Sequence, residues 1–156
     1  MDWRAVLAGV GWGAGYLVLL YLLPPLERVG LVAVPLALGA GPLAGAAAGR
    51  LARGGPAERS RHGLFAGILT GLVFAAAYWH VLSVSRFDSL TPFGRGGAFY
   101  AMKLGFVYSA GDFPLLARYP GRLAGALALL GTAAIALLGG YAGYVAHARD
   151  DVEILG

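Results

Sequence analysis

Four stretches of the chain contain no Asp, Glu, Lys or Arg: residues 5–26, 29–49, 62–85 and 123–148. Each is long enough to cross a bilayer once, because a hydrocarbon core of about 30 Å takes about 20 apolar residues of helix. All 12 basic and 8 acidic side chains lie outside these stretches, as the cost of a charge in lipid requires. The sequence therefore predicts an all-α integral membrane protein with four transmembrane helices, in a single transmembrane domain covering 1–156.

Prolines mark the end of the first predicted span and an irregular point in the second. Pro24 and Pro25 end the first span because proline has no backbone N–H and clashes with the preceding turn. The second span follows so closely that the two must form an antiparallel hairpin. Pro35 and Pro42 each leave a carbonyl one turn earlier without its helical donor, so we expect a kink or break there. The four spans are placed at about 5–23, 30–51, 63–84 and 121–146.

Basic residues gather between the second and third spans, where we expect a flexible loop from Arg50 to His62. By the positive-inside rule this loop is cytoplasmic, which puts both termini in the cytoplasm of a multi-pass protein of the cell membrane. The net charge of +4 lies in the loops, where anionic lipid headgroups explain it more simply than nucleic acid does. The lipid bilayer is therefore a predicted partner and nucleic acid is not. The arginines of this loop are Arg50, Arg53, Arg59 and Arg61.

The outer aromatic segment, residues 85–120, is the only long connection. From Gly96 to Gly111 it is apolar apart from Lys103. Aromatic side chains favour the headgroup level of a bilayer, so we expect an interfacial or re-entrant helix between spans 3 and 4. A fifth full span is disfavoured because Lys103 would lie near its middle. Tyr78 and Trp79 are expected in an aromatic belt at the same membrane surface.

Small residues at four-residue spacing give every span a face without large side chains. Such faces let helix backbones approach closely, which replaces the hydrophobic drive that lipid does not supply. Two of them, Gly11 with Gly15 and Gly139 with Gly143, exceed what closing one bundle requires, so we expect contact with a second copy or another membrane protein. The predicted packing residues are Gly9, Gly11, Gly13, Gly15, Gly41, Gly45, Gly49, Gly63, Gly67, Gly71, Ala128, Thr132, Ala136, Gly139, Gly140 and Gly143.

Three segments of the first half share a distinctive composition: Gly41–Gly49, the Arg-Gly-Gly-Pro-Ala-Glu-Arg stretch at 53–59, and Gly63–Gly71. Through them the chain resembles the small Gly/Ala-rich four-span membrane proteins of salt-loving archaea, many of which are uncharacterised. The resemblance is one of composition and includes no diagnostic motif. It implies a four-span helical fold and transfers no activity.

Histidines are the only candidates for a ligand site, because the chain has no cysteine. His80 lies within the third span, where a neutral imidazole can bind haem or a metal or relay protons. Its neighbours Tyr78 and Trp79 favour an interfacial position instead. His62 and His147 are expected on the same membrane side, without a third ligand. We therefore name His80 as a possible ligand and predict no metal site and no cofactor.

Asp88 and Asp112 form the only carboxylate pair that hydrolysis could use, and solvated loop charges explain them equally well. No Gly-x-Ser-x-Gly, His-Glu-x-x-His or P-loop pattern accompanies them, so no catalytic residue is predicted. The sequence favours a non-enzymatic membrane protein that packs through its small-residue faces, as a homo-oligomer or as an accessory subunit of a larger membrane complex. The alternative is a passive channel or small-solute pore formed by an oligomer, lined by the segment from Pro35 to Pro42.

Overall fold

The protein is a bundle of helices, four of which are long and apolar enough to cross a membrane. The computed structural model describes residues 1–23, 30–83 and 96–153, and the surroundings of side chains in 1–23, 32–83 and 96–146; no strand occurs in these ranges. The predicted all-α class with four membrane-length helices is confirmed, with candidate spans Trp3–Leu22, Val32–Leu51, Pro56–Ser83 and Pro120–Ala146. The described helices are α1 Trp3–Leu22, α2 Gly30–Leu38, α3 Ala40–Leu51, α4 Pro56–Ser83, α5 Gly97–Asp112, α6 Pro114–Arg118 and α7 Pro120–Glu153.

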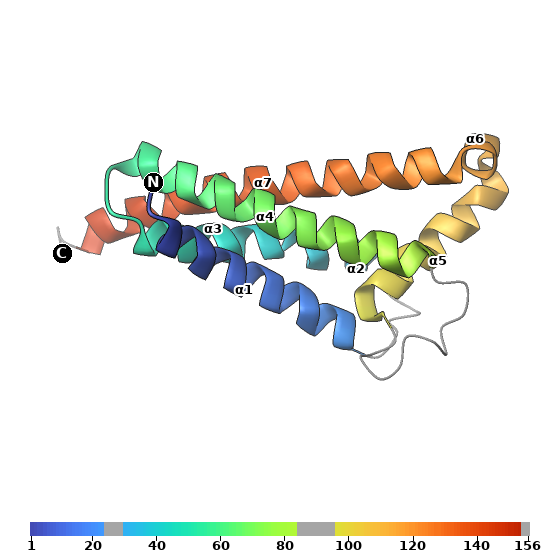
Figure 1. The fold of residues 1–156 in the computed structure, drawn as a ribbon, viewed down its shortest axis with the longest axis horizontal. Helices are drawn as coiled ribbons and strands as arrows, with labels where there is room; N and C mark the ends of the chain where they lie inside the picture. Colours follow the sequence, from blue (N-terminus) through green and yellow to red (C-terminus); the bar gives the residue numbers. More distant parts are fainter. Residues whose placement is uncertain (24–29, 84–95, 154–156) are drawn as a thin grey trace.

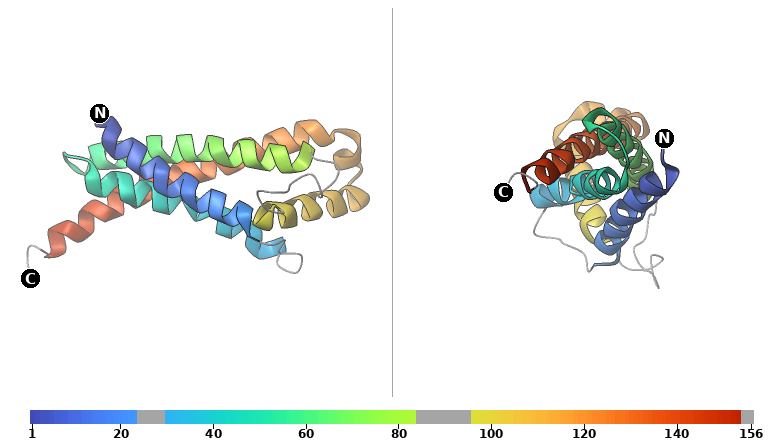
Figure 2. Two further views of the ribbon diagram at one scale, coloured as in Figure 1. Left: turned by 60° about the horizontal axis from the view of Figure 1, so that its bottom comes forward. Right: turned by 90° about the vertical axis from the view of Figure 1, so that its left-hand side faces the viewer.

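The long helices run side by side along the longest axis of the molecule (Figure 1). The start of α1 and the end of α7 lie at one end of the bundle, whereas α5 and α6 lie at the opposite end. α3 and α4 pack against each other and each also packs against α1 and α7. Viewed down the bundle, α1 and α7 therefore flank the central α3–α4 pair (Figure 2).

Glycines bring α3, α4 and α7 together at one junction around Gly139. A Cβ on Gly139 would lie 2.7 Å from the oxygen of Gly63 and 3.3 Å from the oxygen of Gly41. A Cβ on Gly45 would overlap the carbonyl oxygen of Gly139 itself. Side chains larger than hydrogen are excluded here, so the three backbones touch directly. Gly139 and Gly143, which the sequence analysis assigned to a spare face, are thus used inside the bundle.

The break expected near the prolines of the second span lies at Gly39, between α2 and α3. Pro42 has no N–H to offer the carbonyl of Leu38, and the N–H of Gly39 lies 3.1 Å from the oxygens of both Pro35 and Leu36. The hydroxyl of Tyr16, from α1, donates to the Leu36 oxygen at 2.9 Å. A neighbouring helix thereby supplies a donor at the break, as membrane helices with proline require.

The basic connection is shorter than the sequence indicated. α3 continues to Leu51 and α4 begins at Pro56, so the expected flexible loop from Arg50 to His62 is wrong in extent. Pro56 suits the first position of a helix, where no backbone N–H is needed. Gly54 makes the turn before it, with φ of 128°. Most of the loop arginines are therefore carried on helix ends rather than on a flexible connection.

The expected helix over Gly96–Gly111 is present as α5, and its first turns enter the bundle. Gly97 has φ of 43°, and a Cβ on it would meet the carbonyl oxygen of Leu20 in α1. Phe99 is fully buried, with its ring centroid 5.8 Å from that of Phe74. Tyr78, expected in a lipid-facing aromatic belt, is only 5% exposed and stacks on Phe74 instead. The position of α5 relative to a bilayer stays a prediction.

Candidate functional site

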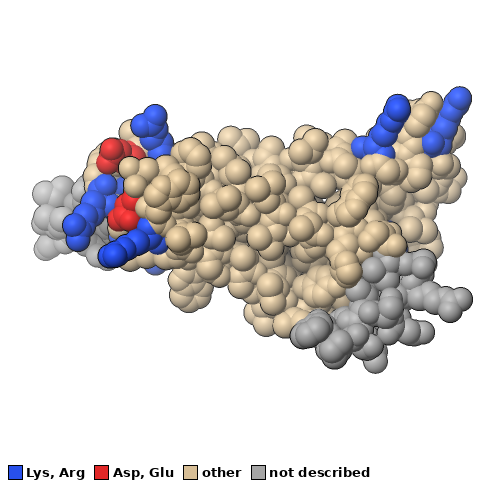
Figure 3. All heavy atoms as spheres, in the orientation of Figure 1, with Lys and Arg blue, Asp and Glu red and all other residues tan. Residues whose placement is uncertain are grey.

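Among the described residues, charged side chains occupy the two ends of the molecule and leave the face between them in Figure 3 uncharged. Within the described ranges no three metal-ligating side chains lie together. The carboxylate pair of the hydrolase alternative stays a prediction: Asp112 is exposed at the end of α5, and Asp88 lies outside the described residues. The described part of the chain therefore offers packing surfaces and apolar cavities as its candidate sites.

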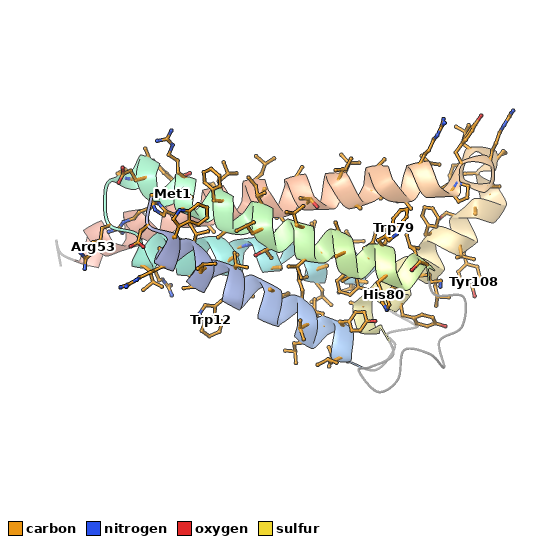
Figure 4. The ribbon with its side chains drawn as sticks, in the orientation of Figure 1. Met1, Trp12, Arg53, Trp79, His80 and Tyr108 are labelled. Carbon is orange, nitrogen blue, oxygen red and sulfur yellow. The ribbon has the colours of Figure 1, made fainter. Side chains whose placement is uncertain are left out.

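His80, the possible ligand, is exposed near the end of α4. Its ring centroid lies 6.4 Å from that of Tyr21 at a tilted angle. Figure 4 places His80 and Trp79 on different sides of the last turns of α4. This imidazole therefore sits in an aromatic setting at the end of the third span, with Tyr21 of α1 as its ring neighbour.

His62 has a structural role that the sequence analysis missed. It is 4% exposed. Its Nδ1 lies 2.6 Å from the Glu58 carbonyl oxygen, and its Nε2 accepts from the Asp2 backbone N–H at 2.7 Å. This pattern fits a neutral ring with its proton on Nδ1, which ties the start of α1 to the start of α4. The side chain of His147, the suggested partner of His62, lies outside the described surroundings.

Pro35 and Pro42, the suggested pore-lining residues, are both exposed on the outside of a single bundle. The glycine junction of α3, α4 and α7 closes the interior at the level of Gly139. A pore along these prolines would therefore have to form between several copies. The channel alternative stays a prediction of the sequence.

Most of the predicted packing residues contact another helix of the same chain. Gly9 and Gly13 of α1 meet α3 and α4, where a Cβ on Gly9 would lie 2.5 Å from the oxygen of Ala44. Gly67 and Gly71 of α4 meet α7 at Ala136 and Thr132 in the same way. Within the described part of the chain, a methyl group added to two of the predicted glycines, Gly11 and Gly15, would meet nothing within 4 Å.

Two threonines lie in the middle of the bundle, and their hydroxyl groups differ in hydrogen bonding. The hydroxyl of Thr132 lies 2.9 Å from the oxygens of both Gly71 and Ala128 and donates to one of them. The hydroxyl of Thr70 is buried and has no hydrogen-bond partner in the described part of the chain. An unsatisfied buried hydroxyl costs about 1 to 3 kcal/mol. Thr70 therefore fills its place against Gly13 at a cost in stability.

We expect Thr70→Val to raise the free energy of unfolding by about 1 kcal/mol, because it removes the unpaired hydroxyl and keeps a similar shape. The matched variant Thr132→Val should lower it by about 0.6 kcal/mol, the average for a hydrogen bond between membrane helices. Both variants are unfolded with sodium dodecyl sulfate in mixed micelles and followed by circular dichroism, which gives the sign of each change in the free energy of unfolding. Equal shifts for both would contradict the assignment.

A cavity of about 490 Å³ lies between α2, α4, α5 and α7. Its floor is formed by buried side chains, among them Phe74, Tyr78 and Met102. Its rim carries exposed residues of α2 and α7, with Val34 50% and Leu130 66% exposed. Its volume is in the range of small-molecule sites. The cavity therefore opens sideways, toward the surface that lipid would cover.

A second cavity of about 240 Å³ lies between α4, α5 and α7, and Phe106 lines both. Lys103 and Trp79 line this smaller one. The Lys103 ammonium donates to the Val81 oxygen at 3.0 Å, which places a positive charge at the negative end of the α4 dipole. Burial lowers the pKa of Lys103 from its ordinary value. The two cavities together combine an apolar space with a cation.

Neither cavity could be found from sequence reasoning. Their walls come from α2, α4, α5, α6 and α7, and no motif links those segments. The one available signal was Lys103, the only charged residue in an otherwise apolar stretch.

No protein-family model matches this chain, and neither a curated protein nor a solved structure matches it.

Proposed function

We propose that this chain is a non-enzymatic membrane protein that associates with a second copy of itself through the outer face of α1. The observation that carries the proposal is the open space over Gly11 and Gly15. The other glycines predicted to pack contact helices of their own chain, so these two have no packing role in the described part of the bundle. Two glycines four residues apart in a charge-free helix favour close helix pairing in lipid.

The surroundings of this glycine pair fit a helix–helix contact. Leu7 and Trp12 are 61% and 67% exposed on the same helix, and Trp12 points away from the bundle (Figure 4). Large side chains next to a small-residue strip can pack against the partner helix while the two backbones approach. A two-fold dimer would use the same α1 face on both copies, so a single open face is enough for a second copy to be the partner.

Replacing both glycines of the pair, Gly11→Leu with Gly15→Leu, should leave the bundle folded and weaken association by about tenfold or more, because bulky residues keep the two backbones apart. The measurement is the molar mass of the purified protein in mild detergent over a range of concentrations. The matched control is Gly111→Leu with Gly125→Leu, two glycines of α5 and α7 where an added Cβ also meets nothing.

A monomeric wild-type protein, or an unchanged mass for the Gly11 and Gly15 variant, would contradict the homodimer. A different membrane protein that co-purifies with the wild type and is lost in this variant would instead assign the α1 face to an accessory subunit. Either result is distinguishable from misfolding, because the helical content and the unfolding midpoint are measured on the same samples.

A further inference from the structure

We propose that the paired cavities around Phe106 form a binding site for one anionic membrane lipid. The hydrocarbon chain occupies the larger cavity, between α2, α4, α5 and α7. The anionic headgroup lies at Lys103 in the smaller one. This site is separate from the α1 face of the proposed dimer and does not depend on it.

The shape of the larger cavity selects a chain that enters from the bilayer. Its floor of Phe74, Tyr78 and Met102 is buried, and its open side lies between Val34 on α2 and Leu130 on α7. A molecule dissolved in lipid can reach such an opening without crossing water. α2 and α7 separate here because the glycine contacts that hold α3 to α7 lie on the other side of the Gly39 break.

The charges at this end of the bundle favour a negatively charged headgroup. Lys103 lines the smaller cavity together with Pro120 and Gly121. Arg118 and Arg122 lie beside that wall, with their guanidinium carbons 5.6 and 5.5 Å from the Tyr119 ring centroid. Among the described residues of α5, α6 and the start of α7, Asp112 is the only acid. This excess of positive charge among the described residues attracts an anionic headgroup at a membrane surface.

Phe106 lies between the two spaces of the proposed site. It lines both cavities, and it lies one helical turn from Lys103 on the same face of α5. A ligand that occupies both cavities has to pass Phe106 to reach the ammonium. A neutral apolar molecule would make no use of Lys103, and a free anion would leave the apolar cavity unused.

Trp79 is a natural probe because it lines the cavity that contains Lys103. The chain has 3 tryptophans, so Trp3→Phe with Trp12→Phe leaves Trp79 as the only one. This protein is placed in bilayers that mix phosphatidylcholine with phosphatidylglycerol, and one of the two lipids carries brominated chains in each series. Fluorescence quenching by each brominated lipid is followed against its fraction in the bilayer. The preference for the anionic lipid should be about fivefold, the effect of one basic residue at an anionic surface.

Two variants test the two halves of the site. Lys103→Met should remove most of the anionic preference, leaving the smaller part that Arg118 and Arg122 supply from beside the cavity. Gly105→Phe should block the larger cavity, because Gly105 lines it and a Cβ there meets nothing, and quenching by bound lipid should fall. The control is Gly111→Phe on the same helix, also in open space and outside both cavities. Its quenching curve should match that of the chain in which Trp79 is the only tryptophan and α5 is unchanged.

The proposal is overturned if brominated phosphatidylglycerol and brominated phosphatidylcholine quench Trp79 equally in the chain where Trp79 is the only tryptophan. It is also overturned if Lys103→Met keeps the preference, or if Gly105→Phe and Gly111→Phe behave alike. Unfolding midpoints and molar masses of all variants separate a lost lipid site from a lost fold or a lost dimer. If the protein is monomeric but still prefers the anionic lipid, the dimer proposal fails and the lipid-site proposal is unaffected.

Discussion

Gly45→Ala should destabilise the bundle by about 3 kcal/mol or more, although it adds a single methyl group. The added Cβ would overlap the carbonyl oxygen of Gly139, and the atoms in its way belong to the α7 backbone rather than to a flexible side chain. Relief requires α3 and α7 to move apart, which also breaks the contact of Gly49 with Gly143. The expected readout is a large fall in the unfolding midpoint in detergent.

Gly125→Ala is the matched control for this change. Gly125 lies on α7 in open space, where an added Cβ meets nothing within 4 Å. Alanine favours a helix over glycine by about 0.8 to 1 kcal/mol, so the control should be neutral or stabilising. The expected result is a large loss of stability for Gly45→Ala and no loss for Gly125→Ala. A Gly45→Ala variant as stable as wild type would mean that the close contact of α3 with α7 is not part of the native packing.

The sequence predicted the four membrane-length helices because a charge in lipid is costly. Helices that cross the bilayer are therefore expected as stretches without charged residues. The charge-free stretches end within a few residues of α1 and the other three spans. The break in the second span was also predictable, since proline removes a backbone donor. Four-residue spacing showed which residues share a face, as Gly45 and Gly49 do on α3.

Spacing alone does not show which helix a small face will meet. Gly139 and Gly143 have the same pattern as Gly11 and Gly15, yet the first pair lies in the junction with α3 and α4 and the second in open space. The difference depends on the rotation of each helix in the assembled bundle. Tyr78 illustrates the same limit, because the arrival of α5 turned a position expected at the lipid surface into a buried one.

The cavities were beyond sequence reasoning for a related cause. A cavity is the space left where helices diverge, and here it results from the break at Gly39 together with the entry of α5 between α2 and α4. Lys103 was recognisable as unusual, but its neighbours Trp79 and Gly121 come from two other helices. Side chains brought together by tertiary contacts have no fixed spacing in the chain.

Gly97→Ala should release the first turns of α5 while the four long helices stay folded. Gly97 has φ of 43°, a left-handed conformation that costs an L-residue about 1 to 2 kcal/mol. The added Cβ would also meet the Leu20 carbonyl oxygen of α1 and lie 3.2 Å from that of Leu23. Both effects act on the contact that holds α5 against α1. Phe99 would then lose its ring neighbours Phe74 and Tyr21.

Amide hydrogen exchange measured by mass spectrometry localises this effect. The α5 amides should exchange about tenfold faster or more in Gly97→Ala, since each 1.36 kcal/mol changes an opening equilibrium tenfold. Exchange in α1, α3 and the core of α7 should be unchanged. Gly111→Ala is the control, because it lies on the same helix in open space. Faster exchange throughout the chain would show that α5 is required for the whole bundle. Unchanged exchange in α5 would show that its docking does not depend on the close approach of Gly97 to Leu20.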